Sequence, residues 1–225
     1  IFLTGKAGTG KSTFIHYFMK HTEKNVIALA YTGIASMNIG GQTINSFLRL
    51  PLKPLVPDDP DITIFKPFYQ KRKIIEITDS VIIDEISMLR SDILQAIDYS
   101  LRHNGGNSNQ LFGGKQLIFV GDIFQLPPIV DQRNKIEVEF FKTKYNSEYF
   151  FDSLAFKQLN PKIFELTKVH RQKNEHFINL LNKVRDSSID LESIQELNTK
   201  YDPNHVQGSN EFSISRLFEG ILKRY

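Results

Sequence analysis

The chain has 225 residues, of which 40% are apolar and 24% charged, and its 28 basic and 25 acidic side chains give a net charge of +3. This composition is typical of a globular protein with a substantial core, and it argues against a disordered chain or a coiled coil. No apolar run approaches the ~18 residues that a membrane helix needs. The absence of cysteine excludes disulfides, zinc–cysteine sites and thiol catalysis. The small net charge means that any basic surface must come from local patches.

Short apolar runs alternate with helical patterns over the first 130 residues. Four runs are predicted as buried parallel strands: Ile1–Thr4, Val26–Ala30, Val81–Asp84 and Leu117–Gly121. Ser91 is expected to cap a helix that carries an apolar stripe. This alternation predicts an α/β fold with a parallel sheet. Because the chain begins without Met, in what reads as a strand already under way, we expect further residues upstream.

Two stretches interrupt the alternation. The first, Pro51 to Lys73, holds five prolines and is predicted to be an exposed inserted loop or a tiny subdomain. Its acidic residues Asp58, Asp59 and Asp61 suggest a solvated loop rather than a metal site. The second, 131–153, is rich in aromatic residues. Beyond it, Ile163–Leu166 is a possible strand, and helices are expected around 177–184 and 191–200.

The strongest motif is Gly5-Lys6-Ala7-Gly8-Thr9-Gly10-Lys11-Ser12, which follows a predicted strand and opens a helix. Backbone amides of such a loop curl around phosphate oxygens, and the helix N-terminus adds positive potential. Lys11 is predicted to reach the β- and γ-phosphates of ATP, and the Ser12 hydroxyl to bind Mg²⁺. The predicted nucleotide-binding residues are Gly8, Thr9, Gly10, Lys11, Ser12 and Thr13. The alternative is a chance glycine-rich turn.

A pair of acids ends the third predicted strand, in Val81-Ile82-Ile83-Asp84-Glu85. This position suits Asp84 for the magnesium side of the site, the Walker-B role. Glu85 can orient or deprotonate an attacking water, which favours ATP hydrolysis over phosphoryl transfer to another hydroxyl. The alternative is that Glu85 only caps the following turn.

The fourth strand leads into Gly121-Asp122-Ile123-Phe124-Gln125-Leu126-Pro127-Pro128. A glutamine just past the carboxyl edge of a strand can hydrogen-bond the γ-phosphate or the attacking water. Gln125 is therefore a candidate for distinguishing ATP from ADP. By itself the motif is weak, since a polar loop would explain it, but its order after the other two motifs strengthens it.

Together, Lys11, Asp84-Glu85 and the Gln125 motif resemble the motifs of superfamily-one DNA helicases. The run from Thr32 to Phe47 (TGIASMNIGGQTINSF) is similar to the Pif-type helicases, relatives of the RecD branch, although Asn45 stands where that family usually has His. Leu166-Thr167-x-x-His170-Arg171-Gln172 resembles that family's fourth motif. The resemblance covers roughly residues 1–186, with five motifs in the family's order.

This resemblance implies a RecA-like P-loop fold that hydrolyses Mg²⁺-ATP and moves 5′-to-3′ on single-stranded DNA. It implies forked duplexes and G-quadruplexes as substrates, roles in DNA repair, recombination and telomere maintenance, and a protein that is monomeric on DNA and has no membrane partner. It also implies a cytoplasmic or nucleoid location in a bacterium, a nuclear or mitochondrial one in a eukaryote, and no secretion.

The resemblance also assigns roles to single residues. Arg171 would be an arginine finger, a role that suits a planar guanidinium facing γ-phosphoryl oxygens. Gly33, Thr43 and Ser46 would lie on the DNA-facing side. Phe47 would either stack on a base or pack in the core. Arg216, in a faint sixth motif, would be a second phosphate-sensing arginine.

The expected domains are an ATP-binding lobe over 1–165, with 51–73 as a small wedge-like insert, and the start or remnant of a second RecA-like lobe over 166–225. The basic run Lys66–Lys73 in the insert is expected to be a solvated face, with contact to the DNA backbone as the alternative. Two other functions stay open. One is a non-helicase P-loop switch or clamp-type ATPase, which would need neither the Thr32–Phe47 run nor the Gln125 motif. The other is a binding module that has lost catalysis, against which the intact motif residues argue.

Overall fold

The computed structural model describes residues 1–170 and 174–199. The chain forms two compact units, Ile1–Gln172 and Lys173–Tyr225, and each is described by itself. The first unit extends past the boundary expected at residue 165 because β6 (Ile163–Leu166) pairs with β1 (Phe2–Gly5) along its whole length. That pairing makes β6 part of the first sheet.

Six parallel strands form the sheet of the first unit, in the order β3-β2-β4-β5-β1-β6. Besides β1 and β6, the strands are β2 (Val26–Ala30), β3 (Gln42–Thr43), β4 (Ser80–Asp84) and β5 (Gln116–Val120). The four strands predicted from apolar runs are confirmed within one residue at each end. The possible strand at Ile163–Leu166 is confirmed as β6, whereas β3, only two residues long, was not anticipated.

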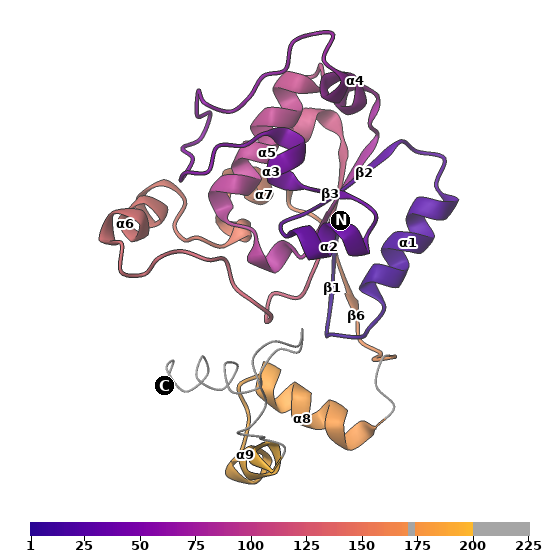
Figure 1. Cartoon of the computed structure of the whole chain (residues 1–225), viewed down its shortest axis with the longest axis vertical. Helices are drawn as coiled ribbons and strands as arrows, with labels where there is room; N and C mark the ends of the chain where they lie inside the picture. Colours follow the sequence, from indigo (N-terminus) through magenta and orange to yellow (C-terminus); the bar gives the residue numbers. More distant parts are fainter. Residues whose placement is uncertain (171–173, 200–225) are drawn as a thin grey trace. The chain divides into compact units, whose positions relative to one another are not determined.

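Helices cover both faces of this sheet (Figure 1). Alternate strand residues face opposite sides, so Ile27 and Leu29 of β2 join one apolar cluster while Ala28 and Ala30 join the other. The first cluster contains α5; the second contains residues of α1 and α2. The helices of this unit are α1 (Lys11–His21), α2 (Gly33–Asn38), α3 (Ile44–Leu48), α4 (Gln70–Ile77), α5 (Ser91–Asn104), α6 (Lys135–Lys144) and α7 (Leu154–Leu159).

The start of α5 differs from its predicted form. Arg90, not Ser91, occupies the N-cap position, and no side chain caps the helix there. The buried Ser91 hydroxyl instead donates to the carbonyl of Ser147, 2.8 Å away. Ser91 therefore joins α5 to the aromatic-rich segment 131–153, a tertiary contact that a local capping rule does not include.

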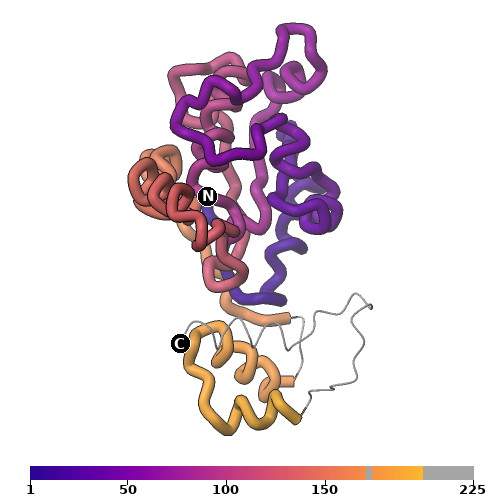
Figure 2. Tube along the Cα trace, turned by 60° about the vertical axis from the view of Figure 1, so that its left-hand side comes forward, coloured from indigo at the N-terminus to yellow at the C-terminus, as the bar shows by residue number. Residues whose placement is uncertain are grey.

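Of the two forms predicted for the proline-rich insert, an exposed loop or a tiny subdomain, the fully exposed loop is wrong. Residues 51–69 form no helix or strand, as Figure 2 shows, but Leu55, Ile62 and Phe65 lie in the main core. The backbone amide of Leu55 donates to the buried carboxylate of Asp92 at 3.0 Å. The amide of Phe65 donates to the Asn104 side chain at 2.7 Å. Since Asp92 and Asn104 lie near the two ends of α5, the insert is anchored along that helix.

Asp59 corrects another expectation about the insert. Its side chain is buried, at 4% exposure for the residue, and its carboxylate lies 3.2 Å from the Lys53 ammonium. Lys53 also pairs with Asp61 at 2.6 Å. A single lysine thus pairs with two of the three acids, so Asp59 is a buried member of an ion-pair cluster, while Asp58 and Asp61 are exposed as expected.

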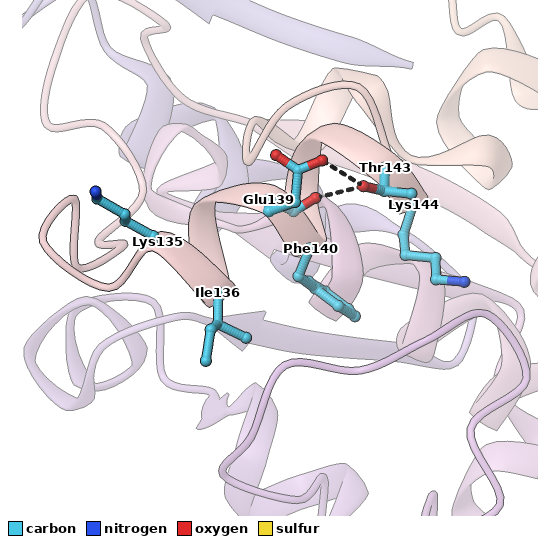
Figure 3. A pocket seen from close by; sticks show the side chains of 6 residues that line it. All are labelled: Lys135, Ile136, Glu139, Phe140, Thr143 and Lys144. Carbon is cyan, nitrogen blue, oxygen red and sulfur yellow. Dashed lines mark hydrogen bonds between the residues drawn. The ribbon is translucent and has the colours of Figure 1, made fainter.

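A hollow of about 600 Å³ runs along α6 (Figure 3). All of its lining side chains come from this one helix: Lys135, Ile136, Glu139, Phe140, Thr143 and Lys144. Thr143 Oγ1 is bonded within the helix, to the Glu139 carbonyl at 2.6 Å. The hollow contains none of the motif residues, so it is a helix face rather than the site of the predicted chemistry.

In the second unit the structure describes two helices, α8 (Glu175–Arg185) and α9 (Leu191–Asn198). Asn174 and Asp190 cap their N-termini through side-chain oxygens. Both predicted helices are confirmed over the described residues; Lys200, the expected end of the second, lies outside them. In the part of the chain that is described, no helix has the length and apolar character of a membrane span.

Candidate functional site

A cavity of about 290 Å³ lies where the loops after β1, β4 and β5 meet. These strands are neighbours in the sheet, so the loops after their carboxyl ends meet at one edge. The lining residues are Ala7, Gly8, Gly10, Lys11, Ser12, Thr13, Asp84, Glu85, Gln125 and His170. The three motifs that the sequence singled out therefore share one cavity.

The P-loop forms the floor of this cavity. Gly8 and Gly10 have φ values of 76° and 96°, a left-handed conformation that favours glycine. The Lys11 ammonium donates to the carbonyls of Gly5 at 2.6 Å and Lys6 at 3.0 Å. Thr9 does not line the cavity; its buried hydroxyl donates to the Lys6 carbonyl at 2.8 Å and so braces the loop from behind.

The P-loop also contacts the segment that leaves β6. A Cβ on Gly5 would lie 2.4 Å from the Leu166 carbonyl oxygen, so only glycine permits this strand pairing. Four residues later, the backbone amide of His170 donates to the Gly8 carbonyl at 2.8 Å. This brings His170 to the cavity wall, a position that sequence reasoning missed and that only its place beside Arg171 could have indicated.

Two carboxylates enter the cavity from the end of β4. Asp84 is its last residue, and Glu85 follows with a φ of 53°, which is uncommon for a residue with a side chain. Glu85 occupies the N-cap position of a 3₁₀ turn, η1 (Ile86–Met88), but makes no side-chain capping bond. The carboxylate is therefore not used as a cap, which removes the main structural alternative for Glu85.

Burial dominates the electrostatics of these acids. Burial raises the pKa of the Asp84 carboxyl, and the nearby Lys11 ammonium opposes that rise. Burial also raises the pKa of Glu85, and the negative charge of Asp84 raises it further. A carboxyl with a raised pKa is a better proton acceptor than an ordinary glutamate at neutral pH, as a general base requires.

Gly121 allows the loop after β5 to approach the acids closely. A Cβ at this position would lie 2.9 Å from the Ile86 side chain and 3.0 Å from the Ile86 backbone nitrogen. Four residues on, the Gln125 amide donates to the Asp122 carboxylate at 3.2 Å while its side chain lines the cavity. Gln125 is thus exposed to solvent, and its side chain is positioned by the hydrogen bond to Asp122, which a merely polar loop would not require.

The cavity has oxygen donors suited to Mg²⁺. Ser12 contributes a hydroxyl and Asp84 a carboxylate, both on its lining. Magnesium is usually bound by one or two carboxylates together with phosphates and water. Among the described residues no cluster of three His, Asp or Glu side chains forms a metal site, so a divalent ion here would depend on phosphate oxygens as further ligands.

The predicted DNA-side residues lie on strands and helices next to this edge. Strand register places Thr43, Ala30 and Asp84 in one row across β3, β2 and β4. The Thr43 hydroxyl accepts from the Ser46 amide at 3.3 Å and so caps α3. Ser46 is exposed, as is Gly33, the first residue of α2.

The structure corrects the predicted DNA-binding role of Phe47. Its side chain belongs to the main core and the residue is 3% exposed. A ring buried in this way has no face available to a base, so the core-packing alternative holds in this structure. The sequence could not decide this because α3 has only five residues, too few to show which side faces the core.

Arg171 and Arg216, the two arginines predicted to sense phosphate, lie outside the described residues. Their roles therefore stay predictions.

A parallel six-stranded sheet with a P-loop after β1, an acidic pair after β4 and a glutamine after β5 defines the class of RecA-like P-loop nucleotide-binding proteins. The family model described as PIF1-like helicase matches residues 1–195. The chain belongs to this family. The predicted fold class is confirmed by both findings.

Relatives and solved structures agree with this membership. The chain is 37% identical over 205 residues to the ATP-dependent DNA helicase PIF1 of Saccharomyces cerevisiae, covering 87% of this chain and 22% of the relative. It is 31% identical to Pif1 of Campylobacter jejuni, covering 84% and 41%. The crystal structure of Bacteroides Pif1 bound to single-stranded DNA matches with a TM-score of 0.81 at 38% identity, covering 94% and 48%. The chain thus spans at most about half of each of these three relatives.

Proposed function

We propose that this chain is the nucleotide-binding part of an ATP-dependent DNA helicase that moves 5′-to-3′ on single-stranded DNA. The observation that supports this most directly is the single cavity shared by Lys11, Glu85 and Gln125. Relatives named ATP-dependent DNA helicase, and a relative solved with ADP-AlF4, support nucleotide hydrolysis coupled to DNA.

Each cavity residue has a defined task in hydrolysis. Backbone amides around Gly8 and Gly10 would bind phosphate oxygens, and Lys11 would leave its carbonyl partners to neutralise the β- and γ-phosphates. Glu85, its pKa raised, would accept the proton of the attacking water. Gln125 would hold that water or a γ-phosphate oxygen. Gln125 would thereby report the presence of the γ-phosphate.

Ser12 and Asp84 would hold Mg²⁺ beside the phosphates. When bound, the ion neutralises charge on the β- and γ-phosphate oxygens. The bound cation would offset the rise that burial causes in the pKa of Asp84, since a cation stabilises the ionised carboxylate. A test independent of turnover is fluorescent-ADP binding with and without Mg²⁺. The Mg²⁺-dependent gain in affinity should be lost in Asp84→Asn and kept in Asp79→Asn, a change at an exposed residue.

The remaining assignments rest on family membership. We propose single-stranded DNA, forked duplexes and G-quadruplexes as the DNA partners, a monomeric form on DNA, and the second unit, Lys173–Tyr225, as the start of a second RecA-like lobe. A Pif1 structure described as the structural basis for DNA unwinding at forked double-stranded DNA supports the second of these DNA partners. The location follows from the substrate: the nucleus or mitochondrion of a eukaryote, or the nucleoid of a bacterium.

The function is tested by ATP hydrolysis with and without single-stranded DNA. We expect DNA to stimulate turnover several-fold and Glu85→Gln to lower the stimulated rate by about 10², while Glu23→Gln, at an exposed site outside the cavity, leaves it unchanged. Hydrolysis that ignores DNA would favour a P-loop switch or clamp-type ATPase. Nucleotide binding without any hydrolysis would favour a binding module.

A further inference from the structure

The basic-aromatic run Lys66–Lys73, at the end of the insert, is divided by the structure into three kinds of residue. Arg72 is paired, with its guanidinium 2.9 Å from the Glu76 carboxylate and also donating to the Phe65 carbonyl. Lys66 and Lys73 are exposed. Lys71, by contrast, is half-buried and contacts α3 through the Ser46 carbonyl. The run is therefore not one uniform solvated face.

Lys71 is tied to the end of α3. Its ammonium donates to the Ser46 carbonyl at 2.5 Å and lies 5.8 Å from the centre of the Phe47 ring. Burial lowers the pKa of Lys71, and the positive charge of Arg49 lowers it further. Two cations thus stand near each other at the junction of α3 and the insert.

Arg49 is held in an unusual conformation at the same junction. It is the C-cap of α3 and has φ 54° and ψ 46°, a left-handed conformation in which Gly or Asn is less strained. Its guanidinium donates to the Tyr69 hydroxyl at 2.6 Å and lies 5.1 Å from the centre of that ring. Its carbonyl accepts from the Thr63 hydroxyl at 3.1 Å.

These contacts fix both cations without neutralising them. Over the described residues, neither Arg49 nor Lys71 has a carboxylate partner, whereas Lys53, Arg72 and Arg90 all do. Tyr69 is itself stacked on the buried Phe65, with ring centres 5.2 Å apart. Arg49 and Lys71 are therefore preorganised, mutually repelling and solvent-accessible, which is the arrangement that an anion stabilises.

We propose that Arg49 and Lys71, positioned by Tyr69, form a phosphate site for the backbone of single-stranded DNA. The site continues the surface of Thr43 and Ser46 towards the insert, since Lys71 is bonded directly to the Ser46 carbonyl. The chemistry recognised is a phosphodiester: a guanidinium and an ammonium on one anionic group, with no side chain that reads a base.

This inference rests on the proposed function and adds to it. It gives the insert a second task besides packing on α5, because Tyr69 and Lys71 come from the insert and the start of α4 while Arg49 comes from the end of α3. A strand of DNA crossing the junction would neutralise both cations and thereby fasten α3 to the insert.

The test is the salt dependence of binding to a fluorescein-labelled oligothymidine, measured by anisotropy. Each lost phosphate contact should reduce the slope of log K against log salt by about 0.7. We expect part of this reduction, with weaker binding at low salt, in Arg49→Asn and in Lys71→Gln, and the full reduction of about 0.7 in the double variant, because both cations contact one phosphate. Asparagine tolerates the left-handed conformation of position 49, so the backbone should persist.

Two controls separate charge from fold. Lys73→Gln removes one exposed ammonium from the same helix and should leave the slope unchanged. Lys71→Arg keeps the charge and should show the slope of the wild type. An unchanged slope in both Arg49→Asn and Lys71→Gln would overturn the site. So would an equal loss in Lys73→Gln, or no recovery in Lys71→Arg.

The failure of this site is distinguishable from failure of the proposed function. If the wild-type chain binds oligothymidine and hydrolyses ATP in response, but the variants bind like wild type, only the phosphate site is wrong. If the wild-type chain does not bind oligothymidine at all, both proposals fail. Fluorescent-ADP affinity should be equal in all variants, because none of the changed residues lines the P-loop cavity.

Discussion

The P-loop cavity and the junction of α3 with the insert differ in how well the sequence predicts their residues. In the cavity, Lys11, Glu85 and Gln125 meet where their motifs predicted. At the junction, Phe47, for which stacking on a base and packing in the core were both open, is buried. Arg49 and Lys71, neither of them predicted as a site residue, carry the positive charge there. Residues at the ends of neighbouring strands are placed by the sheet itself. A surface assembled from a short helix and an irregular loop is placed by packing.

The two regions also differ in charge. Two carboxylates, Asp84 and Glu85, line the cavity together with Lys11, and burial raises the pKa of both. The junction brings two cations together with no carboxylate partner among the described residues. The first arrangement suits a divalent cation with phosphates, and the second suits a phosphate backbone alone.

The largest effect is expected at Arg171, which would join the cavity to the second lobe. As an arginine finger, Arg171→Ala should leave ATP binding largely intact and lower turnover roughly 10³-fold. Lysine should rescue poorly, because a point charge does not reproduce the planar fork. Single-turnover hydrolysis with saturating single-stranded DNA measures this, with the exposed Arg133→Ala as control. A wild-type rate in Arg171→Ala would exclude the arginine-finger role.

Lys11→Ala should produce the next largest loss. Removal of a preorganised charge that faces developing negative charge typically costs ~10²-fold or more in rate. Lys20→Ala, which removes a lysine from the other end of α1, should have no effect on turnover. If Lys11→Ala kept more than about a tenth of the DNA-stimulated rate, the P-loop assignment would be wrong.

Glu85→Gln separates nucleotide binding from hydrolysis. The amide keeps the shape but accepts no proton, so Mg²⁺-ATP should bind nearly as in wild type while turnover falls by about 10². In the wild type, turnover should fall as pH is lowered through a value above the 4.5 of an ordinary glutamate, because burial raises the pKa. Equal losses of affinity and turnover would make Glu85 structural.

The same raised pKa has a consequence for stability. The folded state binds this proton more tightly than the unfolded state, so the contribution of Glu85 to stability is most favourable at low pH and declines as pH rises towards the folded pKa. Glu85→Gln should remove this pH dependence and raise Tm at neutral pH. Thermal denaturation between pH 4 and pH 8 is the corresponding measurement, and a lower Tm at neutral pH would contradict the burial argument.

The smallest effect on DNA binding is expected at Phe47. Phe47→Ala should lower the free energy of unfolding by about 3–5 kcal/mol, as for a buried phenylalanine. Phe47→Leu should fold and bind oligothymidine within about two-fold of wild type, whereas loss of base stacking would remove ~1–3 kcal/mol of affinity. Phe68→Ala, at an exposed ring, serves as the control for stability. A folded Phe47→Leu with tenfold weaker binding would restore the stacking role.

The sequence by itself determined four of the six strands and the nucleotide site. Apolar runs of strand length predicted four strands within one residue, and the motif spacing predicted which residues would share a cavity. The physical reason is that these features are local: glycines set the loop conformation, and each motif directly follows a strand. Parallel pairing of β4, β5 and β1 then brings the motifs together.

Only the tertiary structure decided what the side chains outside the motifs do. Ser91 bonds to Ser147 instead of capping α5, and the proline-rich insert gives Leu55 and Phe65 to the core because Asp92 and Asn104 hold its backbone. Such contacts join residues far apart in the chain and leave no periodic or compositional signal. Whether an aromatic ring or a lysine faces solvent, core or DNA therefore depends on which distant segment packs beside it.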